Sequence, residues 1–358
     1  MKLLFYGARS LAFGMCKATQ KLYPEHMIIG FLVNSLDNNP GTLAGLPVME
    51  LTSFSMNLSE QEKNDLHIIV ATPEDIHEEI INGLKEHGFI NYTCMDSRNE
   101  AALMKRYFSQ LGLFQSLHML PAGTNKAIMR VYEARFHKDK PLYKKYMKPS
   151  WIKSIQVGAA LTNDKIADLR DNYGENISIK NVNYCELTAL YWVWKNELKS
   201  DYDVEYYGLF HYRRVLDILD SDVYLLKEND VDVILQYPTL HEPDINEHHL
   251  RYLNEKDWEA MLQALLELQP EYADAFPEIL SQQYFYNYNL IIAKKQILED
   301  YCKWLFPILE RTEELSIPKG NERADRYIGY LGESLMTLYF LYHKEDLNIL
   351  HTGRFMLT

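Results

Sequence analysis

The sequence is short of cysteine, of long apolar runs and of positive charge, and each shortage excludes a class of protein. Its four cysteines are scattered and form no CxxC pair, which argues against a disulfide framework or a zinc cluster and is typical of a reducing cytoplasm. No apolar run approaches the roughly 20 residues that span a bilayer. Residues 1–14 lack a secretory cleavage pattern and predict a core strand instead. We therefore expect a cytoplasmic protein.

The shortage of positive charge restricts the partners. The formal net charge is −13, which disfavours nucleic acid because its phosphate backbone binds basic surfaces. Residues 113–150 are the exception, with eight Lys or Arg against two Asp or Glu. Such a stretch usually forms a solvated face, and the alternatives are a phosphate-lined cleft or an anionic membrane surface. Residues 126–148 are therefore the candidates for peripheral contact with the inner face of the membrane.

Length and periodicity predict two α/β domains. The chain has 358 residues, against roughly 150 for a typical domain. Strand patterns alternate with helical patterns over residues 1–112, which indicates a Rossmann-like parallel sheet. Gly112, Pro121 and Gly123 mark a linker at 113–125. Further strand and helix patterns predict a second α/β domain over residues 126–358, with its site at the carboxyl ends of the strands.

The glycine loop after the first strand departs from the dinucleotide fingerprint. Arg9 stands where GxGxxG has its second glycine, and Asn34 replaces the acidic ribose ligand. Both features argue against NAD binding. The series YGARSLAFG, GFLVN, LPV and IIVATP resembles the N-terminal domain of sialic-acid-type sugar O-acyltransferases, which implies a domain that can hold a nucleotide-sugar. A structural, regulatory or dimerising role, and with it a homo-oligomer, stays open.

A cluster of charge ends one predicted strand of the second domain. YYGLFHYRR at 206–214 reads as a strand that closes with His211, Tyr212, Arg213 and Arg214. Because side chains alternate along a strand, we expect His211 and Arg213 on one face and the other two residues on the opposite face. Desolvated guanidinium groups need anionic partners. Those partners are either a bound diphosphate, which arginine holds bidentately, or carboxylates of an internal network.

The second domain as a whole resembles a known family. The resemblance rests on an ordered series of motifs: RVYEARFHKD, IQVGAAL, DNYGENISIKNVNYCELTALYWVWKN, YYGLFHYRRVL, LQYPTLH, YNYNLII, YCKWLFPILE and RYIGYLGESL. It covers about residues 127–355. The family is a bacterial one, long labelled a domain of unknown function and now regarded as capsular and exopolysaccharide glycosyltransferases. It implies a GT-A-like fold, a nucleotide-sugar donor (UDP-galactose is the best guess) and a surface-glycan acceptor that is free or lipid-linked.

The resemblance assigns donor-binding roles to two groups of residues. In GT-A enzymes the first strand and the following loops hold the nucleotide, which here places four residues near the uridine: His137, Lys138, Val157 and Gly158. Four more would line the donor pocket: Asn176, Ser178, Asn181 and Glu186. Asn181 and Glu186 have an alternative role, which is to cap and brace the helix that follows them.

HYRR falls where many GT-A enzymes carry DxD, the pair of carboxylates that binds manganese. Arg213 or Arg214, beside His211, would then neutralise the leaving diphosphate in the electrostatic role of a metal. Whether Mn²⁺ or Mg²⁺ is also a cofactor stays open. Asp230 and Asp232 do spell DxD, but they precede a strand instead of ending one, which favours a turn.

The acceptor side and the catalytic base are also assigned by resemblance. FYNYNLII is similar to the acceptor-side strand of related transferases, which suggests Asn287 and Asn289 as ligands of sugar hydroxyls. Glu333, on an otherwise apolar helical pattern, is a candidate general base, and pairing with Arg326 is the alternative. LHTGRF resembles a C-terminal His-x-Gly segment, which suggests that His351 contacts the diphosphate.

The segment HEPDINEHH at 241–249 was examined for a metal site. Its spacing matches neither HExxH nor another rigid metal motif. A solvated acceptor loop is the expectation, with His241 as an acceptor ligand.

Together these features predict a hexosyltransferase that moves a hexose from a UDP-sugar to a capsule, exopolysaccharide or lipopolysaccharide acceptor. Two alternatives stay open. One is a nucleotide-sugar oxidoreductase or epimerase that works through the first domain. The other is a non-catalytic scaffold of polysaccharide assembly in which HYRR is a structural ion network.

Overall fold

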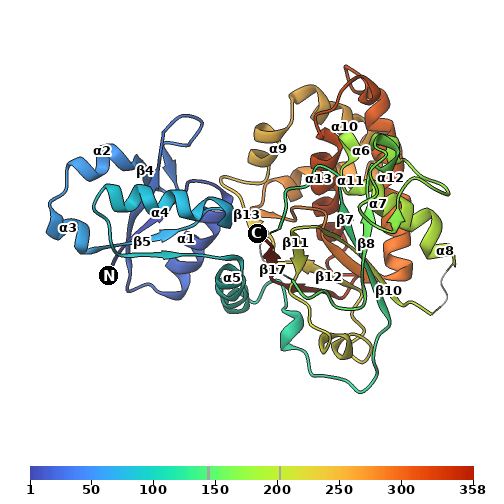
Figure 1. Cartoon of the computed structure of the whole chain (residues 1–358), viewed down its shortest axis with the longest axis horizontal. Coiled ribbons are helices and arrows are strands. Elements are labelled where there is room, and N and C mark those ends of the chain that lie inside the picture. The colour runs from blue at the N-terminus through green and yellow to red at the C-terminus, as the bar shows by residue number, and fades with distance from the viewer. Residues whose placement is uncertain (143–145, 201–202) are drawn as a thin grey trace.

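The computed structural model describes residues 1–142, 146–200 and 203–358. The chain forms an α/β protein with two separate sheets, which confirms the predicted fold class (Figure 1). Residues 1–111 make an N-terminal unit, and the chain from residue 129 onward makes a larger C-terminal unit.

The N-terminal unit is Rossmann-like, as the alternating pattern predicted. Its sheet has the order β3-β4-β2-β1-β5-β6, and the pairs are parallel except β3 with β4. The strands are β1 Lys2–Tyr6, β2 Met27–Val33, β3 Thr42–Leu43, β4 Leu46–Glu50, β5 Leu66–Val70 and β6 Tyr92–Cys94. The helices are α1 Ser10–Leu22, α2 Leu51–Met56, α3 Glu60–Asn64, α4 His77–Glu86 and α5 Ser97–Leu111, with a short 3₁₀ helix at Glu74–Ile76.

The C-terminal unit is built on a mixed sheet with the order β16-β12-β15-β10-β7-β8-β9. Adjacent strands are parallel except at β15, which runs antiparallel to β10 and β12. The strands are β7 Met129–Arg135, β8 Ile152–Gln156, β9 Leu169–Arg170, β10 Tyr206–His211, β12 Val233–Gln236, β15 Ile291–Lys294 and β16 Ile349–Thr352. Two short strands, β11 Arg214–Leu216 and β17 Arg354–Met356, extend from β10, and β13 Thr239–Leu240 pairs with β14 Tyr284–Phe285.

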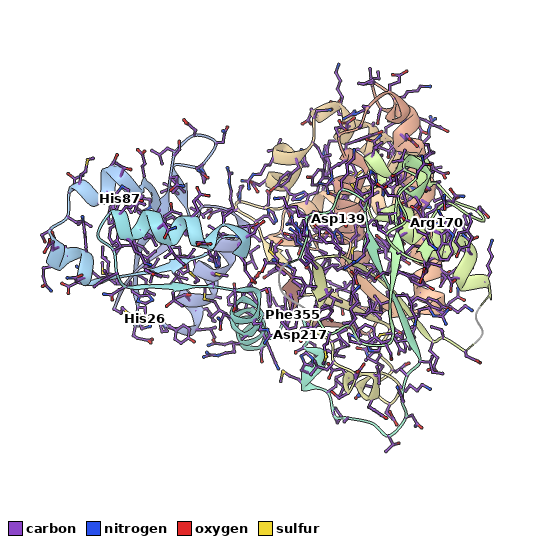
Figure 2. The ribbon with its side chains drawn as sticks, in the orientation of Figure 1. His26, His87, Asp139, Arg170, Asp217 and Phe355 are labelled. Carbon is purple, nitrogen blue, oxygen red and sulfur yellow. The ribbon has the colours of Figure 1, made fainter. Side chains whose placement is uncertain are left out.

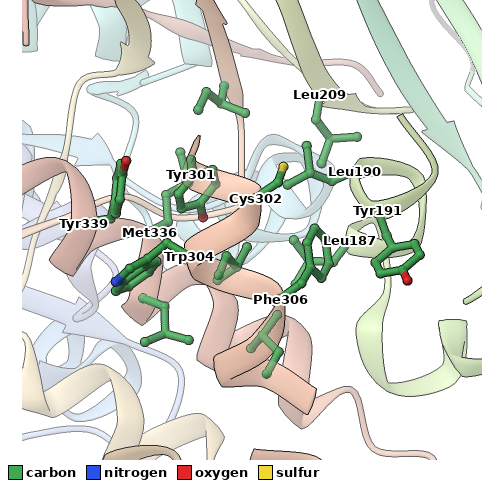
Figure 3. Packing of buried hydrophobic residues seen from close by; sticks show 14 of the residues in the cluster. Leu187, Leu190, Tyr191, Leu209, Tyr301, Cys302, Trp304, Phe306, Met336 and Tyr339 are labelled. Atoms are coloured by element: carbon green, nitrogen blue, oxygen red, sulfur yellow. The ribbon is translucent and has the colours of Figure 1, made fainter. Parts of the chain in front are cut away.

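Helices cover this sheet and enclose the main core. They are α6 Asn181–Tyr184, α7 Leu187–Trp192, α8 Leu198–Ser200, α9 Asn246–Tyr252, α10 Glu255–Leu268, α11 Pro270–Leu280, α12 Lys295–Leu315 and α13 Tyr327–Tyr342. Leu187, Leu190, Cys302 and Met336 bring α7, α12 and α13 into one cluster (Figure 3). Because α13 is buried on nearly all sides, it reads as an apolar helix in the sequence.

The two units meet along α5 and the C-terminal strand β17, which contact each other (Figure 1). Arg354 pairs with Glu100 at 3.4 Å, and the backbone N–H of Met356 donates to the Ser97 hydroxyl at 3.0 Å. The predicted linker at 113–125 packs along the C-terminal unit, where Ser116 forms a bridge with His351. The domain boundaries themselves stay a prediction.

Among the described residues, no helix is both long enough and apolar enough to cross a membrane. The basic stretch 126–148, predicted as a membrane contact, includes residues 143–145, which lie outside the described residues.

The close packing of β15 against Gly208 of β10 gives a prediction about stability. A Cβ added at Gly208 of β10 would lie 2.4 Å from the Ile291 carbonyl oxygen and 2.8 Å from Cγ1 of Ile292. Gly208→Ala therefore forces β10 and β15 apart, and we expect a loss of about 2 kcal/mol in the free energy of unfolding. Urea unfolding followed by circular dichroism measures it.

The matched control is Gly83→Ala in α4, where an added Cβ meets nothing within 4 Å. Alanine is the better helix former, so this variant should gain about 0.5–1 kcal/mol. An unchanged unfolding midpoint in Gly208→Ala would contradict the steric argument.

Candidate active site

Three residues predicted from separate motifs meet at the carboxyl end of β10. The imidazole Nε2 of His211 lies 3.4 Å from Oε1 of Glu186 and 2.7 Å from the carbonyl oxygen of Tyr288. The side-chain amide of Asn289 donates to the same Oε1 of Glu186 at 2.7 Å. One carboxylate therefore joins the end of β10, the start of α7 and the segment before β15.

Glu186 is a buried acid that stays ionised. Its side chain is 8% exposed, and burial alone raises the pKa of a carboxyl group. The charge of His211 and the hydrogen bonds from His211 and Asn289 outweigh this effect and hold the pKa of Glu186 below its usual value. The expected alternative, a cap on the following helix, is wrong for Glu186, because its side chain makes no capping hydrogen bond to α7.

The backbone beside this cluster is strained. Tyr288 and Asn289 have φ values of +69° and +49°, in the left-handed region that non-glycine residues rarely occupy. Each such residue costs about 1–3 kcal/mol, and strain of this kind gathers at functional sites. FYNYNLII, which resembles a single acceptor-side strand, is interrupted here, because β14 ends at Phe285 and β15 begins at Ile291. The buried Oδ1 of Asn289 has no hydrogen-bond partner among the described residues.

Asp171 fixes the turn after β8, and the sequence analysis missed it. Its carboxylate accepts hydrogen bonds from the backbone N–H groups of Gly158 at 2.9 Å and Ala159 at 3.1 Å, and from the hydroxyls of Ser178 and Thr188. Gly158 has a φ of +59°, and an added Cβ would lie 2.8 Å from Oδ1 of a neighbouring asparagine. Asp171 directly follows the two-residue strand β9, so only recognition of that short strand could have marked it.

The other residues predicted for the donor pocket shape the same turn. Asn181 donates to the Cys185 carbonyl at 2.7 Å and to the Thr188 hydroxyl at 3.2 Å, which is the bracing role given as its alternative. Asn176 bonds within its own turn, to the Gly174 carbonyl and the Ser178 N–H. These contacts hold the loop at the edge of the site. Direct contact of these side chains with a donor stays a prediction.

The loop after β7 carries the residues predicted near the uridine. Val157 on the neighbouring loop is buried, His137 lies against the Phe136 ring at 4.2 Å, and Lys138 is exposed. Asp139, which the sequence analysis missed, accepts the Phe136 N–H at 2.8 Å (Figure 2). Burial raises the pKa of Asp139 to about 6, although that hydrogen bond and the charges of His211, Arg135 and Arg213 oppose the shift.

HYRR is a hairpin connection and not one strand. β10 ends at His211, residues 212 and 213 turn, and Arg214 opens β11 opposite His211. The predicted alternation of faces is therefore wrong, because the two-residue period holds only within a strand. Arg213 lies 3.6 Å from Asp75 of the N-terminal unit, and the Arg214 guanidinium lies 4.2 Å from the centre of the Tyr288 ring.

Glu333 faces a histidine. Its Oε2 lies 3.5 Å from Nε2 of His248, and the side chains of Glu333 and His248 are 9% and 3% exposed. The alternative, in which Glu333 pairs with Arg326, is wrong within the described part of the chain. The Nε of Arg326 instead donates to the Cys185 sulfur at 3.3 Å.

The three histidines of the segment 241–249 are buried, so the expected solvated loop is wrong for them. His248 packs on Phe285 and His249 stacks on Trp258. His241 lies 3.2 Å from Glu247 and contacts Thr239, whose hydroxyl donates to Oδ1 of Asn287. Phe285 is far away in the sequence, so the polar composition of the segment gave no sign that His248 is buried.

His351 is also buried, with its Nε2 2.8 Å from the Tyr286 hydroxyl. Burial lowers the pKa of His351 to about 3, against an opposing hydrogen bond with Gln115, so the ring is neutral. Its contact with a diphosphate stays a prediction. Asp230 and Asp232 both pair with Lys294 just before β12, which confirms the predicted turn.

The residues at the end of β10 do not fit a divalent cation. HYRR presents two guanidinium groups there, and carboxylate clusters are what Mg²⁺ and Mn²⁺ prefer. In the described ranges, no three His, Cys, Asp or Glu side chains form a metal-binding group.

A profile described as a domain of unknown function (DUF4422) matches residues 132–345. Eight chains of solved structures match. One is an apo structure of the bifunctional glycosyltransferase WbbM, with 26% sequence identity and a TM-score of 0.54. The match covers 65% of this chain and 46% of that one, so this chain corresponds to less than half of the WbbM structure. No curated protein matches.

Asp139 generates a prediction about pH. The pKa of this carboxyl rises from an ordinary 3.8 to about 6 in the fold, so the native state retains a proton that the unfolded state releases. Its stabilising contribution is full below about pH 4 and is lost as the pH rises to about 6. Relative to Asp139→Asn, the wild type should therefore lose melting temperature between pH 4 and pH 6.

Asp168→Asn is the control, because that carboxylate is fully exposed. Its difference from the wild type should stay constant over the same pH range. A constant difference for Asp139→Asn as well would show that Asp139 titrates normally.

Proposed function

The chain belongs to the DUF4422 family, and from this premise we propose that it is a glycosyltransferase that takes its sugar from a nucleoside-diphosphate donor. The observation that carries the proposal is the cluster of His211, Glu186 and Asn289 at the carboxyl end of β10. In open α/β sheets, ligands bind at the carboxyl ends of the strands. The sheet order with its one reversed strand, and the similarity to WbbM, support the same function.

The nucleoside would lie over the ends of β7 and β8. Asp171 holds the Gly158 turn there, and the glycine lets the Asn181 side chain pack directly against the turn. His137 and Lys138 follow β7 on the adjacent loop. The loop that packs against this turn is held by hydrogen bonds of Asn176, Ser178 and Asn181.

The diphosphate would bind the two arginines of HYRR. Arg214 is held against Tyr288, and no carboxylate among the described residues lies within ion-pair distance of it. Among the described residues, the partly exposed Asp75 is the ion-pair partner of Arg213. Two guanidinium groups in a sheltered site stabilise the charge that develops on a leaving diphosphate.

The acceptor would approach from the side of α13. Glu333, buried beside His248, is the proposed general base that takes a proton from an acceptor hydroxyl. Asn287, Asn289 and His241 are the proposed ligands of sugar hydroxyls. UDP-galactose as donor, a capsule, exopolysaccharide or lipopolysaccharide glycan as acceptor, and action at the inner face of the membrane follow from the resemblance of the motifs and complete the proposal.

The first experiment measures the melting temperature with UDP, UDP-galactose and NAD, each with and without Mn²⁺. A ligand at 100 times its Kd stabilises the native state by about 2.7 kcal/mol. We expect a rise with the UDP compounds and its loss in the Arg213→Ala/Arg214→Ala double variant.

Asp75→Asn is the matched control, because it breaks the same ion pair between the units while it keeps the arginine. It should respond to UDP at least as strongly as the wild type, because the diphosphate then no longer competes with Asp75 for Arg213. A shift with NAD alone would contradict the proposal and transfer the chemistry to the N-terminal unit.

Glu333→Gln tests the proposed base separately. Loss of a general base slows a reaction by about 10²–10⁴-fold. The rate at which UDP is released from the donor should therefore fall by that factor, while the affinity for UDP is unchanged. Glu345→Gln, an exposed site just beyond α13, should keep both. Equal loss of UDP binding in Glu333→Gln would make this residue structural.

A further inference from the structure

A pocket of about 540 Å³ lies between the two units and shares no residue with the proposed donor site. The turn from β1 into α1 and the segment before β3 form one wall, and residues between β13 and the end of α9 form the other. Figure 1 shows β13 at the border with the N-terminal unit. The volume is in the range of pockets that hold small molecules.

The two carboxylates of the pocket are already engaged. Glu247 forms an ion pair with Arg251 and lies 3.2 Å from His241. Oε2 of Glu242 accepts the backbone N–H of Ala44 at 2.6 Å. Neither carboxylate is therefore available to a cation from outside.

Arg9 is a charge of this pocket that has no ion-pair partner among the described residues. Its guanidinium donates to the carbonyl oxygen of Asn38, and no described carboxylate lies within ion-pair distance of it. Burial and then the charge of Arg251 lower the pKa of Arg9, and the charge of Glu247 opposes them. The two guanidinium groups repel each other, and an anion bound between them would offset this repulsion.

We propose that the pocket between the units binds a phosphate group of the acceptor, with Arg9 and Arg251 as its ligands. The proposal rests on the proposed transferase function. His241 lines the pocket, and its contact with Thr239 leads to Asn287, so a chain of side chains joins the pocket to the proposed acceptor residues. A planar guanidinium binds phosphate oxygens in pairs.

A phosphate ligand would explain why an arginine stands at position 9. The dinucleotide fingerprint needs a glycine there for close approach of a pyrophosphate to the backbone. The arginine prevents that approach, and it offers a side-chain ligand to a phosphate that reaches the pocket from the C-terminal unit.

The test is calorimetric titration of the full chain with inorganic pyrophosphate, with and without saturating UDP. Arg9→Gln breaks no ion pair among the described residues, so it should fold normally. We expect it to weaken pyrophosphate binding by about tenfold or more, since a charged hydrogen bond is worth about 1.5–3 kcal/mol, and to leave UDP affinity unchanged. Lys85→Gln, an exposed charge of α4, should change neither affinity.

Two outcomes overturn the assignment: no pyrophosphate binding by the wild type, or binding that survives Arg9→Gln but disappears in Arg213→Ala/Arg214→Ala. The second outcome places pyrophosphate in the donor site and leaves the proposed function standing. If the wild type binds pyrophosphate but no UDP, and Arg9→Gln no longer binds pyrophosphate, the phosphate pocket stands and the transferase proposal fails.

The source of the phosphate is distinguished by two further probes. Geranyl pyrophosphate represents a lipid-linked acceptor, and glucose 6-phosphate represents a phosphorylated sugar. Arg9-dependent binding of either supports the pocket, and the tighter of the two identifies the source. If both probes bind and neither depends on Arg9, the assignment of the phosphate to this pocket is overturned.

Discussion

The buried carboxylate of Glu186 is the interaction on which the arrangement of the candidate site depends. It sits at the start of α7, yet its two partners come from the end of β10 and from the segment before β15. A buried charge that loses one partner destabilises a protein by about 3–5 kcal/mol. The three segments therefore cannot move apart independently, and the strained backbone at Tyr288 and Asn289 is held by bonds that compensate its cost.

The apolar core gives this polar cluster a fixed frame. Leu187 and Leu190 pack α7 against α12 directly behind Glu186, and Leu331 and Leu335 bury α13 on either side of Glu333. Both acids are thus anchored on helices whose positions are set by close packing, because a well-packed core tolerates little displacement. A site built on such elements holds its geometry before any substrate binds.

Much of the fold was predictable because its signals are local. The alternation of strands and helices, the apolar helix at 327–342 and the charged end of β10 are all visible in short windows of sequence. The predictions were wrong where the tertiary structure overrides a rule that holds for neighbouring residues. Alternation of faces failed at Arg213 because the chain turns after His211, and His241 and His248 are buried against Phe285, which is far along the chain. Asp171 and Asp139 escaped notice because a single aspartate after a strand has no period to reveal it.

The position of Arg213 between the two units has a consequence for how they work together. Its pair with Asp75 spans 3.6 Å and is partly exposed, and such pairs contribute about 1 kcal/mol or less. In the proposed donor complex a diphosphate would carry more charge than Asp75 and would reach Arg214 as well, so it would compete for Arg213. On this proposal the N-terminal unit would not block the donor site, and donor binding would replace the pair of Arg213 with Asp75. The second pair between the units, Arg354 with Glu100, does not involve HYRR.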